Sequence, residues 1–202
     1  MGDNSKPKIF GFVGSPRKGG NSELLTKELL KTAEQNGAET EIIRLAEYDL
    51  KPCDACLSCR KTRKCKIDDD GEKLYSKVME ADGIVLATPV YFGSCSPLTK
   101  IFIDRMGYLA RAQEGGLPLN NKVGSALVVA RRAGANFAYA QVLYFFLISG
   151  MIVPGVSYWT IAYGREKGEV LNDKEGVDTA REMGKKITWL TRLIKSEARN
   201  KE

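Results

Sequence analysis

The chain has 202 residues, of which 28% are charged and 43% hydrophobic, and its formal net charge is +6. This length suits one α/β domain, and no apolar stretch approaches the roughly 18 residues that a membrane helix requires. The chain contains no histidine, which removes the commonest catalytic base and most mixed zinc sites.

Charge and cysteine chemistry narrow the function classes further. Lys and Arg are scattered among acidic residues, and only residues 60–66 and the C-terminal segment are locally basic. We therefore expect no nucleic-acid partner, and attribute the positive balance to an anionic cofactor or an acidic electron-transfer partner. The N-terminal segment MGDNSKPKIF has no apolar signal region, so we expect a reducing cytoplasm, no disulfides and no membrane association.

The first third of the chain predicts a strand–helix–strand unit. An apolar strand is expected over residues 8–13 (KIFGFV), a helix over 22–35 and a second strand over 40–45 (TEIIRL). Residues 46–70 then break this pattern, because they are polar, rich in cysteine and without a regular apolar period. We interpret that segment as an ordered loop inserted into the domain.

Regular alternation of helices and strands resumes after residue 70. Helices are expected over residues 72–81, 98–110, 136–149 and 173–195, and strands over 83–87, 123–130 and 152–162, the last interrupted near Pro154 and Gly155. Five strands separated by helices predict a parallel sheet covered on both faces. We expect a single domain over residues 1–202, with its ligands at the carboxyl ends of the strands.

The loop after the first strand, GSPRKGGNS at residues 14–22, is suited to a phosphate monoester. A helix N-terminus offers free N–H groups there, and hydroxyl, amide and guanidinium donors lie beside it. The spacing fits neither a P-loop nor a dinucleotide-binding turn, although a simple capped glycine turn remains the alternative. The candidate phosphate-binding residues are Ser15, Arg17, Lys18, Gly20, Asn21 and Ser22.

Two further loops follow later strands and supply candidates for binding a flat ring. The segment TPVYFG offers two aromatic side chains and free backbone amides, and the segment ARRAGAN offers positive charge. Buried aromatic residues and solvated arginines are the alternatives. The candidate ring-binding residues are Thr88, Pro89, Val90, Tyr91, Phe92, Gly93, Arg131, Arg132 and Gly134.

Four cysteines within thirteen residues form the pattern CxxCxxCx5C at Cys53, Cys56, Cys59 and Cys65. Such spacing lets a compact loop surround an iron–sulfur cluster, as in the ferredoxin run. Structural zinc is the main alternative, and free thiols are a further one. Cys95 lies outside the pattern, and we interpret it as a small buried hydrophobic residue.

The order KIFGFVGSPRKGGNS, PCDACLSCRKTRKC and TPVYFGSCSPLTKIFIDR resembles the iron–sulfur flavoproteins of the NADPH-dependent FMN reductase group, within the flavodoxin-like superfamily. The likeness covers roughly residues 8–159. It implies a three-layer sandwich with strand order 2-1-3-4-5, FMN bound by the first two loops, and a 4Fe-4S cluster on the four cysteines. Residues 131–134 match that family less well, because its members often carry more glycine there.

By this resemblance we expect a flavin-dependent oxidoreductase that takes electrons from ferredoxin or NAD(P)H and delivers them to oxygen, peroxide or a quinone-like compound. The alternative is a cluster-free NAD(P)H-dependent FMN or quinone reductase with zinc or bare thiols in the loop. Apolar residues concentrated in 137–151 and 153–159 predict a homodimer or homotetramer. Because the second strand should lie at a sheet edge, we expect cluster and flavin to pair across a subunit interface.

Overall fold

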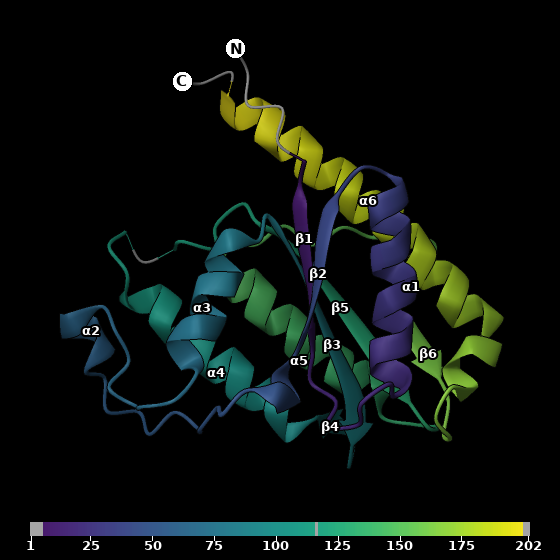
Figure 1. The fold of residues 1–202 in the computed structure, drawn as a ribbon, viewed down its shortest axis with the longest axis horizontal. Helices are drawn as coiled ribbons and strands as arrows, with labels where there is room; N and C mark the ends of the chain where they lie inside the picture. The colour runs from purple at the N-terminus through teal and green to yellow at the C-terminus, as the bar shows by residue number, and fades with distance from the viewer. Residues whose placement is uncertain (1–5, 116, 200–202) are drawn as a thin grey trace.

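A twisted parallel sheet runs through the centre of the structure, a computed structural model that describes residues 6–115 and 117–199 (Figure 1). Its parallel strands lie in the order β2-β1-β3-β5-β6, which is 2-1-3-4-5 when they are counted along the chain. The predicted order is therefore confirmed. The strands are β1 (Lys8–Val13), β2 (Glu39–Arg44), β3 (Gly83–Tyr91), β5 (Val123–Ala130) and β6 (Ile161–Tyr163).

Helices cover both faces of the sheet and complete the predicted three-layer, flavodoxin-like sandwich. Helices α1 (Asn21–Gln35) and α6 (Lys174–Arg199) lie on one face, to the right in Figure 1. Helices α3 (Gly71–Glu80), α4 (Pro97–Ala112) and α5 (Ala135–Ile148) lie on the other. Shorter helices are η1 (Leu45–Glu47), α2 (Cys59–Thr62) and η2 (Glu169–Asn172).

Side-chain alternation along β1 explains why the sheet needs helices on both faces. Ile9 and Val13 join the apolar core beneath α1 and α6, whereas Phe10 and Phe12 join the core beneath α3, α4 and α5. The Phe12 ring packs against Phe102 of α4 with 4.9 Å between ring centroids. Side chains along the neighbouring strands alternate between the two faces in the same way. Each helix layer therefore covers a separate core.

The structure corrects the prediction for the fifth strand. Only Ile161–Tyr163 forms a strand, and Ile152 makes an isolated bridge to Val123. Proline cannot donate a ladder hydrogen bond and glycine weakens a strand, so Pro154 and Gly155 release the chain from the sheet between these two contacts. The strand β3 runs further than predicted, through Tyr91, because a two-residue strand β4 (Ser94–Cys95) folds back and pairs with it.

The segment at residues 46–70 lies between β2 and α3, as expected for an insertion after the second strand. It contains part of η1 and the short helix α2, which its irregular sequence did not predict. The single-domain prediction also covers residues 1–5, 116 and 200–202, which lie outside the described residues. Across the described ranges, no helix combines the length and apolarity that crossing a bilayer requires.

Candidate functional site

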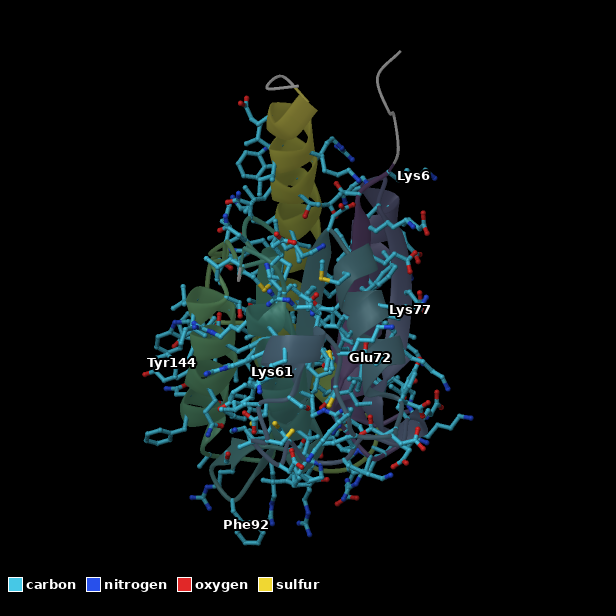
Figure 2. The ribbon with its side chains drawn as sticks, turned by 90° about the vertical axis from the view of Figure 1, so that its left-hand side faces the viewer. Lys6, Lys61, Glu72, Lys77, Phe92 and Tyr144 are labelled. Atoms are coloured by element: carbon cyan, nitrogen blue, oxygen red, sulfur yellow. The ribbon has the colours of Figure 1, made fainter. Side chains whose placement is uncertain are left out.

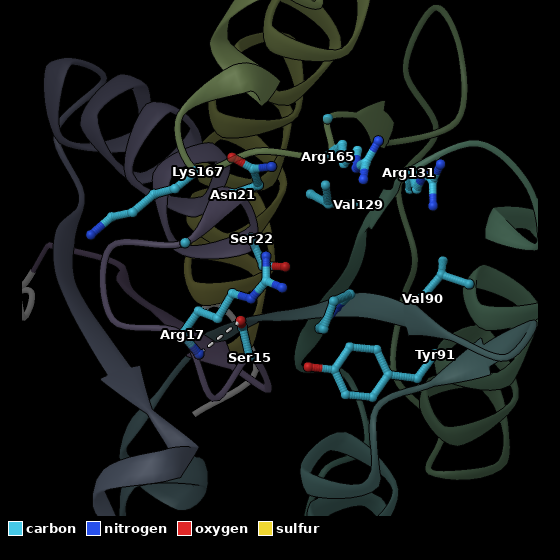
Figure 3. A pocket seen from close by; sticks show the side chains of 13 residues that line it. Ser15, Arg17, Asn21, Ser22, Val90, Tyr91, Val129, Arg131, Arg165 and Lys167 are labelled. Atoms are coloured by element: carbon cyan, nitrogen blue, oxygen red, sulfur yellow. Dashed lines mark hydrogen bonds between the residues drawn. The ribbon is translucent and has the colours of Figure 1, made fainter.

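Four strand ends converge on a pocket of about 280 Å³, which we call the strand-end pocket (Figure 3). Its walls come from the loop after β1, the end of β3, the end of β5 and the loop after β6. Parallel strands place their carboxyl ends at one edge of the sheet, so the convergence follows from the topology. The lining residues are Ser15, Arg17, Gly20, Asn21, Ser22, Pro89, Val90, Tyr91, Val129, Arg131, Gly164, Arg165 and Lys167.

The loop after β1 presents the N-terminus of α1 to this pocket. Gly20 is the N-cap residue, and no side chain caps the helix, so the first-turn N–H groups remain available to a ligand. Ser15 and Ser22 are buried against this end. The Glu23 carboxylate accepts a hydrogen bond from Gly19 N–H at 2.7 Å and fixes the loop from behind. This is the geometry of a phosphate site.

The Asn21 side chain, a predicted phosphate donor, is hydrogen-bonded to the loop after β6. Its side-chain Nδ2 donates to the Glu166 carbonyl at 2.9 Å, and its Oδ1 accepts from Gly168 N–H at 2.8 Å. The amide thus joins the loop after β1 to the loop after β6. We interpret Asn21 as a residue that positions two walls of the pocket rather than as a phosphate donor.

The predicted ring-binding loop is a tight hairpin between β3 and β4. Tyr91 lines the strand-end pocket, and its hydroxyl points toward Ser15 in Figure 3. Phe92 does not, because the turn residues Phe92 and Gly93 both have positive φ and direct the Phe92 side chain outward, where it is fully exposed (Figure 2). Thr88 is buried beneath the loop, where its hydroxyl accepts from Ser96 N–H at 2.9 Å.

Of the remaining predicted residues, some line the strand-end pocket and others lie outside it. Arg131 lines the pocket, while Lys18 and Arg132 are exposed outside it. Gly134 begins α5 with φ +84°, and a Cβ there would lie 2.8 Å from the Gly93 Cα. Gly93 and Gly134 therefore allow two loops to touch behind the pocket wall.

Sequence reasoning missed Val129 and the wall formed by Gly164, Arg165 and Lys167. The signal for that wall was present, because the segment GREKG follows the last strand and strand ends gather at one edge. The last strand is only three residues long. Because the predicted strand ran over residues 152–162, the loop after it was not recognised as part of the site.

The lining of the strand-end pocket is cationic. It includes Arg17, Arg131, Arg165 and Lys167, and within the described residues it includes no Asp or Glu. In Figure 3, Arg131 and Arg165 lie at one side and Arg17 at the other. Together with the uncapped helix, this charge fits one phosphate monoester attached to a flat group resting between residues 89–91 and residues 129–131. The residues present therefore fit FMN.

A second pocket contains all four cysteines of the CxxCxxCx5C pattern. Cys53, Cys56, Cys59 and Cys65 line it, together with apolar side chains such as Leu109 of α4. We call it the cysteine pocket. All four cysteines thus line one pocket, although they lie on a loop, a short helix and another loop.

Backbone strain is concentrated around the cysteine pocket. Of the five non-glycine residues with positive φ in the described chain, Ala55, Leu57 and Arg63 lie between Cys53 and Cys65. Each such residue costs about 1–3 kcal/mol and persists only where its surroundings hold it. Part of that hold comes from Glu72, whose carboxylate accepts the Cys65 N–H at 2.8 Å.

A buried ion pair between Arg105 of α4 and Asp69 also anchors the inserted segment to the domain. The two side chains are 1% and 0% exposed, and their closest N–O distance is 2.5 Å. Burial raises the pKa of Asp69, but hydrogen bonds from Arg105 and from the Lys51 and Gly71 N–H groups outweigh it and hold that pKa at about 2. Asp69 is therefore ionised at neutral pH.

The thiols in the cysteine pocket influence one another. Burial raises the pKa of Cys59, and the charges of Cys65, Cys56 and Cys53 raise it further. The Cys59 thiolate is thus unfavourable there without a cationic group. Among the residues that the structure describes, no three Cys, Asp or Glu side chains converge on a position for one metal ion.

Comparisons with known proteins identify the family of the chain. The model of the NADPH-dependent FMN reductase family matches residues 7–166. An iron–sulfur flavoprotein of Methanocaldococcus jannaschii is 41% identical over 93% of this chain and 99% of its own. Another, from Methanosarcina thermophila, is 36% identical over 93% of this chain and 96% of its own.

Solved structures support the fold. RosB with bound 8-demethyl-8-formylriboflavin-5'-phosphate superposes with a TM-score of 0.76 at 20% identity, over 98% of this chain and 88% of that one. At this identity the likeness establishes the flavodoxin-like arrangement of strands and helices and nothing finer.

Proposed function

The chain belongs to the iron–sulfur flavoproteins of the NADPH-dependent FMN reductase family, and from this premise we propose that it transfers electrons between a 4Fe-4S cluster and FMN. It is a flavin-dependent oxidoreductase. The observation that carries the proposal is the presence, on one chain, of a cationic strand-end pocket and a separate pocket lined by four cysteines.

Bound FMN accepts a hydride or single electrons, and a bound cluster passes one electron at a time. The first-turn N–H groups of α1, with Ser15, Ser22 and Arg17, would hold the phosphate. Residues 89–91 would support the ring on one side, and Arg131 and Arg165 would offset negative charge that develops on it. Asn21 would keep the two loops at a fixed separation.

The four thiolates of the cysteine pocket would each bind a different metal atom, and the apolar wall would exclude water from them. The alternative is a cluster-free FMN or quinone reductase, in which the four cysteines bind zinc or remain free thiols. Similarity to iron–sulfur flavoproteins along nearly the whole chain favours the cluster. The reducing cytoplasm belongs to the same proposal, since these thiolates must stay reduced to bind iron.

A homo-oligomer, either a dimer or a tetramer built from two dimers, is part of the proposal. An apolar groove of about 480 Å³ separates α4 from α5 and is lined by residues such as Ile103, Tyr144 and Ile148. Tyr144 is 69% exposed and stands at the outer edge of the molecule (Figure 2). Helix α5 is apolar on every side, and helices of that kind are normally buried. A second copy would cover this groove.

The groove also supports pairing of the two cofactors across the interface. Tyr108 lines both the groove and the cysteine pocket. At the other end, the Gln141 side chain lines the groove and accepts hydrogen bonds from Ser94 Oγ and Cys95 N–H in the β3–β4 hairpin. A two-fold contact over this groove would therefore bring the cysteine pocket of one copy toward the hairpin of the other.

Reduced ferredoxin or NAD(P)H is the proposed electron donor, and oxygen, peroxide or a quinone-like compound the proposed acceptor. The cysteine pocket is bordered by exposed basic residues, including Arg60, Lys61 and Lys64. This charge suits an acidic protein donor that docks close to the cluster. If so, the rate of reduction falls as ionic strength rises; a rate independent of salt would favour NAD(P)H over an acidic protein.

The Cys59→Ser protein tests the electron path. FMN content and oligomeric state are first matched to the parent protein, and flavin reduction by chemically reduced ferredoxin is then followed without oxygen. We expect reduction to be abolished, because Cys59 is one of four proposed cluster ligands. If the flavin of the variant is reduced as fast as that of the parent, the cluster is not the entry path.

Sedimentation tests the interface. The parent protein is expected to form a dimer or larger species at micromolar concentration, and the Tyr144→Lys, Ile148→Lys double variant to dissociate. A matched Trp189→Lys variant changes an exposed aromatic residue on the other face, on α6, and is expected to remain assembled. A parent protein that sediments only as a 22.3 kDa species would refute the proposed assembly.

A further inference from the structure

Arg105 is a buried cation, and one of its hydrogen-bond donors has no partner among the described residues. Its side chain is 1% exposed. One terminal nitrogen donates to the Lys51 carbonyl at 2.8 Å and to Asp69 Oδ2 at 2.5 Å, and the other donates to Asp69 Oδ1 at 2.9 Å. The Nε–H group is buried and has no hydrogen-bond partner among the described residues. Leaving such a donor unsatisfied in the interior is costly.

The buried Arg105 side chain is also part of the cysteine pocket. Arg105 lines that pocket together with all four cysteines. A hydrogen bond to Asp69 raises the pKa of Arg105 despite its burial, and the charge of Cys65 acts in the same direction. The backbone also brings Cys65 to this guanidinium, because the Cys65 N–H donates to Glu72, and the residue before Glu72, Gly71, lies directly against Arg105.

The surrounding residues hold Arg105 in this position. Asp69 binds the guanidinium through both oxygens, which fixes its plane. A side chain at Gly71 would overlap the guanidinium, so residue 71 leaves the space that Arg105 fills. Glu72, on the same turn of α3, holds the Cys65 backbone. Gly71 and Glu72, in the first turn of α3, thus help to position Arg105 and Cys65.

Thiolate ligands of an iron–sulfur cluster accept N–H hydrogen bonds, and such bonds, together with nearby positive charge, make the cluster easier to reduce. A donor already buried in the pocket needs no rearrangement to make such a bond. Asp69 offsets part of the positive charge of Arg105, but it binds the two terminal nitrogens and leaves the Nε–H group without a partner.

We propose that Arg105 donates its Nε–H to the Cys65 sulfur of the bound cluster and thereby raises the reduction potential of the cluster. The inference rests on the proposed function, because it requires the cluster to be present. The competing explanation is that Arg105 serves only to join residues 51 and 69 to α4, in which case the potential does not depend on it.

The first test uses the intact parent protein, labelled with ¹⁵N only in the arginine guanidinium groups. In the reduced protein, pulsed electron paramagnetic resonance is expected to show coupling between the cluster and one guanidinium nitrogen, and this coupling is expected to disappear in an Arg105→Lys variant. A parent protein that holds its cluster but shows no such coupling would overturn the inference, whether or not any variant folds.

The second test measures the potential by anaerobic redox titration. Arg105→Gln is expected to lower the equilibrium constant for cluster reduction at least tenfold, which is about 59 mV for one electron. Arg105→Lys keeps the charge and loses the Nε donor, so we expect a smaller shift of about threefold in the same direction. The control Arg111→Gln removes an exposed cation of the same helix and is expected to change the constant by less than about twofold.

The outcomes separate the two claims. A parent protein without iron and sulfide overturns both the proposed function and this inference. A parent protein with its cluster, and Arg105 variants whose reduction constant matches that of the Arg111→Gln control, overturns the inference alone.

Discussion

The strand-end pocket is built by the fold itself, whereas the cysteine pocket lies beside the sheet on an inserted segment. The first uses loops that any five-stranded parallel sheet brings together, and its polar groups are backbone N–H groups and exposed cations. The second depends on a strained backbone and a buried ion pair, Arg105–Asp69. A fold can therefore supply one cofactor site directly and must add specific buried contacts to support another.

The comparison predicts that the two sites can be lost separately, and a cluster ligand gives the largest effect. Cys65→Ser is expected to remove most of the iron while FMN content stays unchanged, because no residue of the cysteine pocket lines the strand-end pocket in the described chain. Iron and flavin assays on the purified variant measure this. Cys95→Ser, outside the pattern, is the control and is expected to keep both cofactors; joint loss of iron and FMN from Cys65→Ser would contradict the separation.

Removing one partner of the buried ion pair is the next largest effect. Asp69→Asn leaves the Arg105 charge uncompensated and is expected to lower the free energy of unfolding by about 3–5 kcal/mol. The control is Glu28→Gln, which breaks a partly exposed pair with Arg181 and is expected to cost about 1 kcal/mol or less. Urea unfolding of both variants decides the point, and equal effects would show that the cysteine region does not depend on the pair.

The same pair predicts how stability responds to acid. The pKa of Asp69 is about 2 in the folded protein and about 3.8 without its partners. Because the folded value is lower, the stabilisation is complete above about pH 4 and is lost as pH falls toward 2. It amounts to roughly 2 kcal/mol. Unfolding free energies measured at pH 6, 4 and 2.5 test this; a slope in this window that is as steep in Asp69→Asn as in the parent would exclude Asp69 as its source.

A smaller effect is expected at the strand-end pocket, where no single contact dominates. Asn21→Ala removes two hydrogen bonds that join the loops after β1 and β6, and we expect about tenfold weaker FMN binding, or about 1.4 kcal/mol. Lys18→Ala, in the same loop but outside the pocket, is expected to leave the affinity unchanged. Flavin titrations of the two apo-proteins make the comparison, and equal affinities would argue against the positioning role of Asn21.

The sequence predicted the sheet order and much of the strand-end pocket because both follow from local patterns. Apolar runs mark β1, β3 and β5, and the polar loops that follow them must gather at one edge. It did not predict that the Phe92 side chain points outward, since the hairpin that turns it depends on pairing between β3 and β4. It also failed for the wall at residues 164–167, because the strand before it is three residues long.

The cysteine pocket was predicted only as a set of ligands. The spacing of four cysteines identified them, but nothing local connects them with Arg105, which lies 40 residues beyond Cys65 in the sequence. Arg105 sits on an amphipathic helix among residues that resemble ordinary core and surface positions. Buried charges of this kind are paired through tertiary contacts, so a sequence pattern does not reveal them.

The most direct test of two different sites on one chain is a cofactor analysis of protein purified without oxygen. Absorption spectra with iron, sulfide, zinc and flavin assays are expected to give about one FMN, about four iron and about four sulfide per chain, with no zinc. One zinc per chain without sulfide, or a flavin other than FMN, would contradict the account.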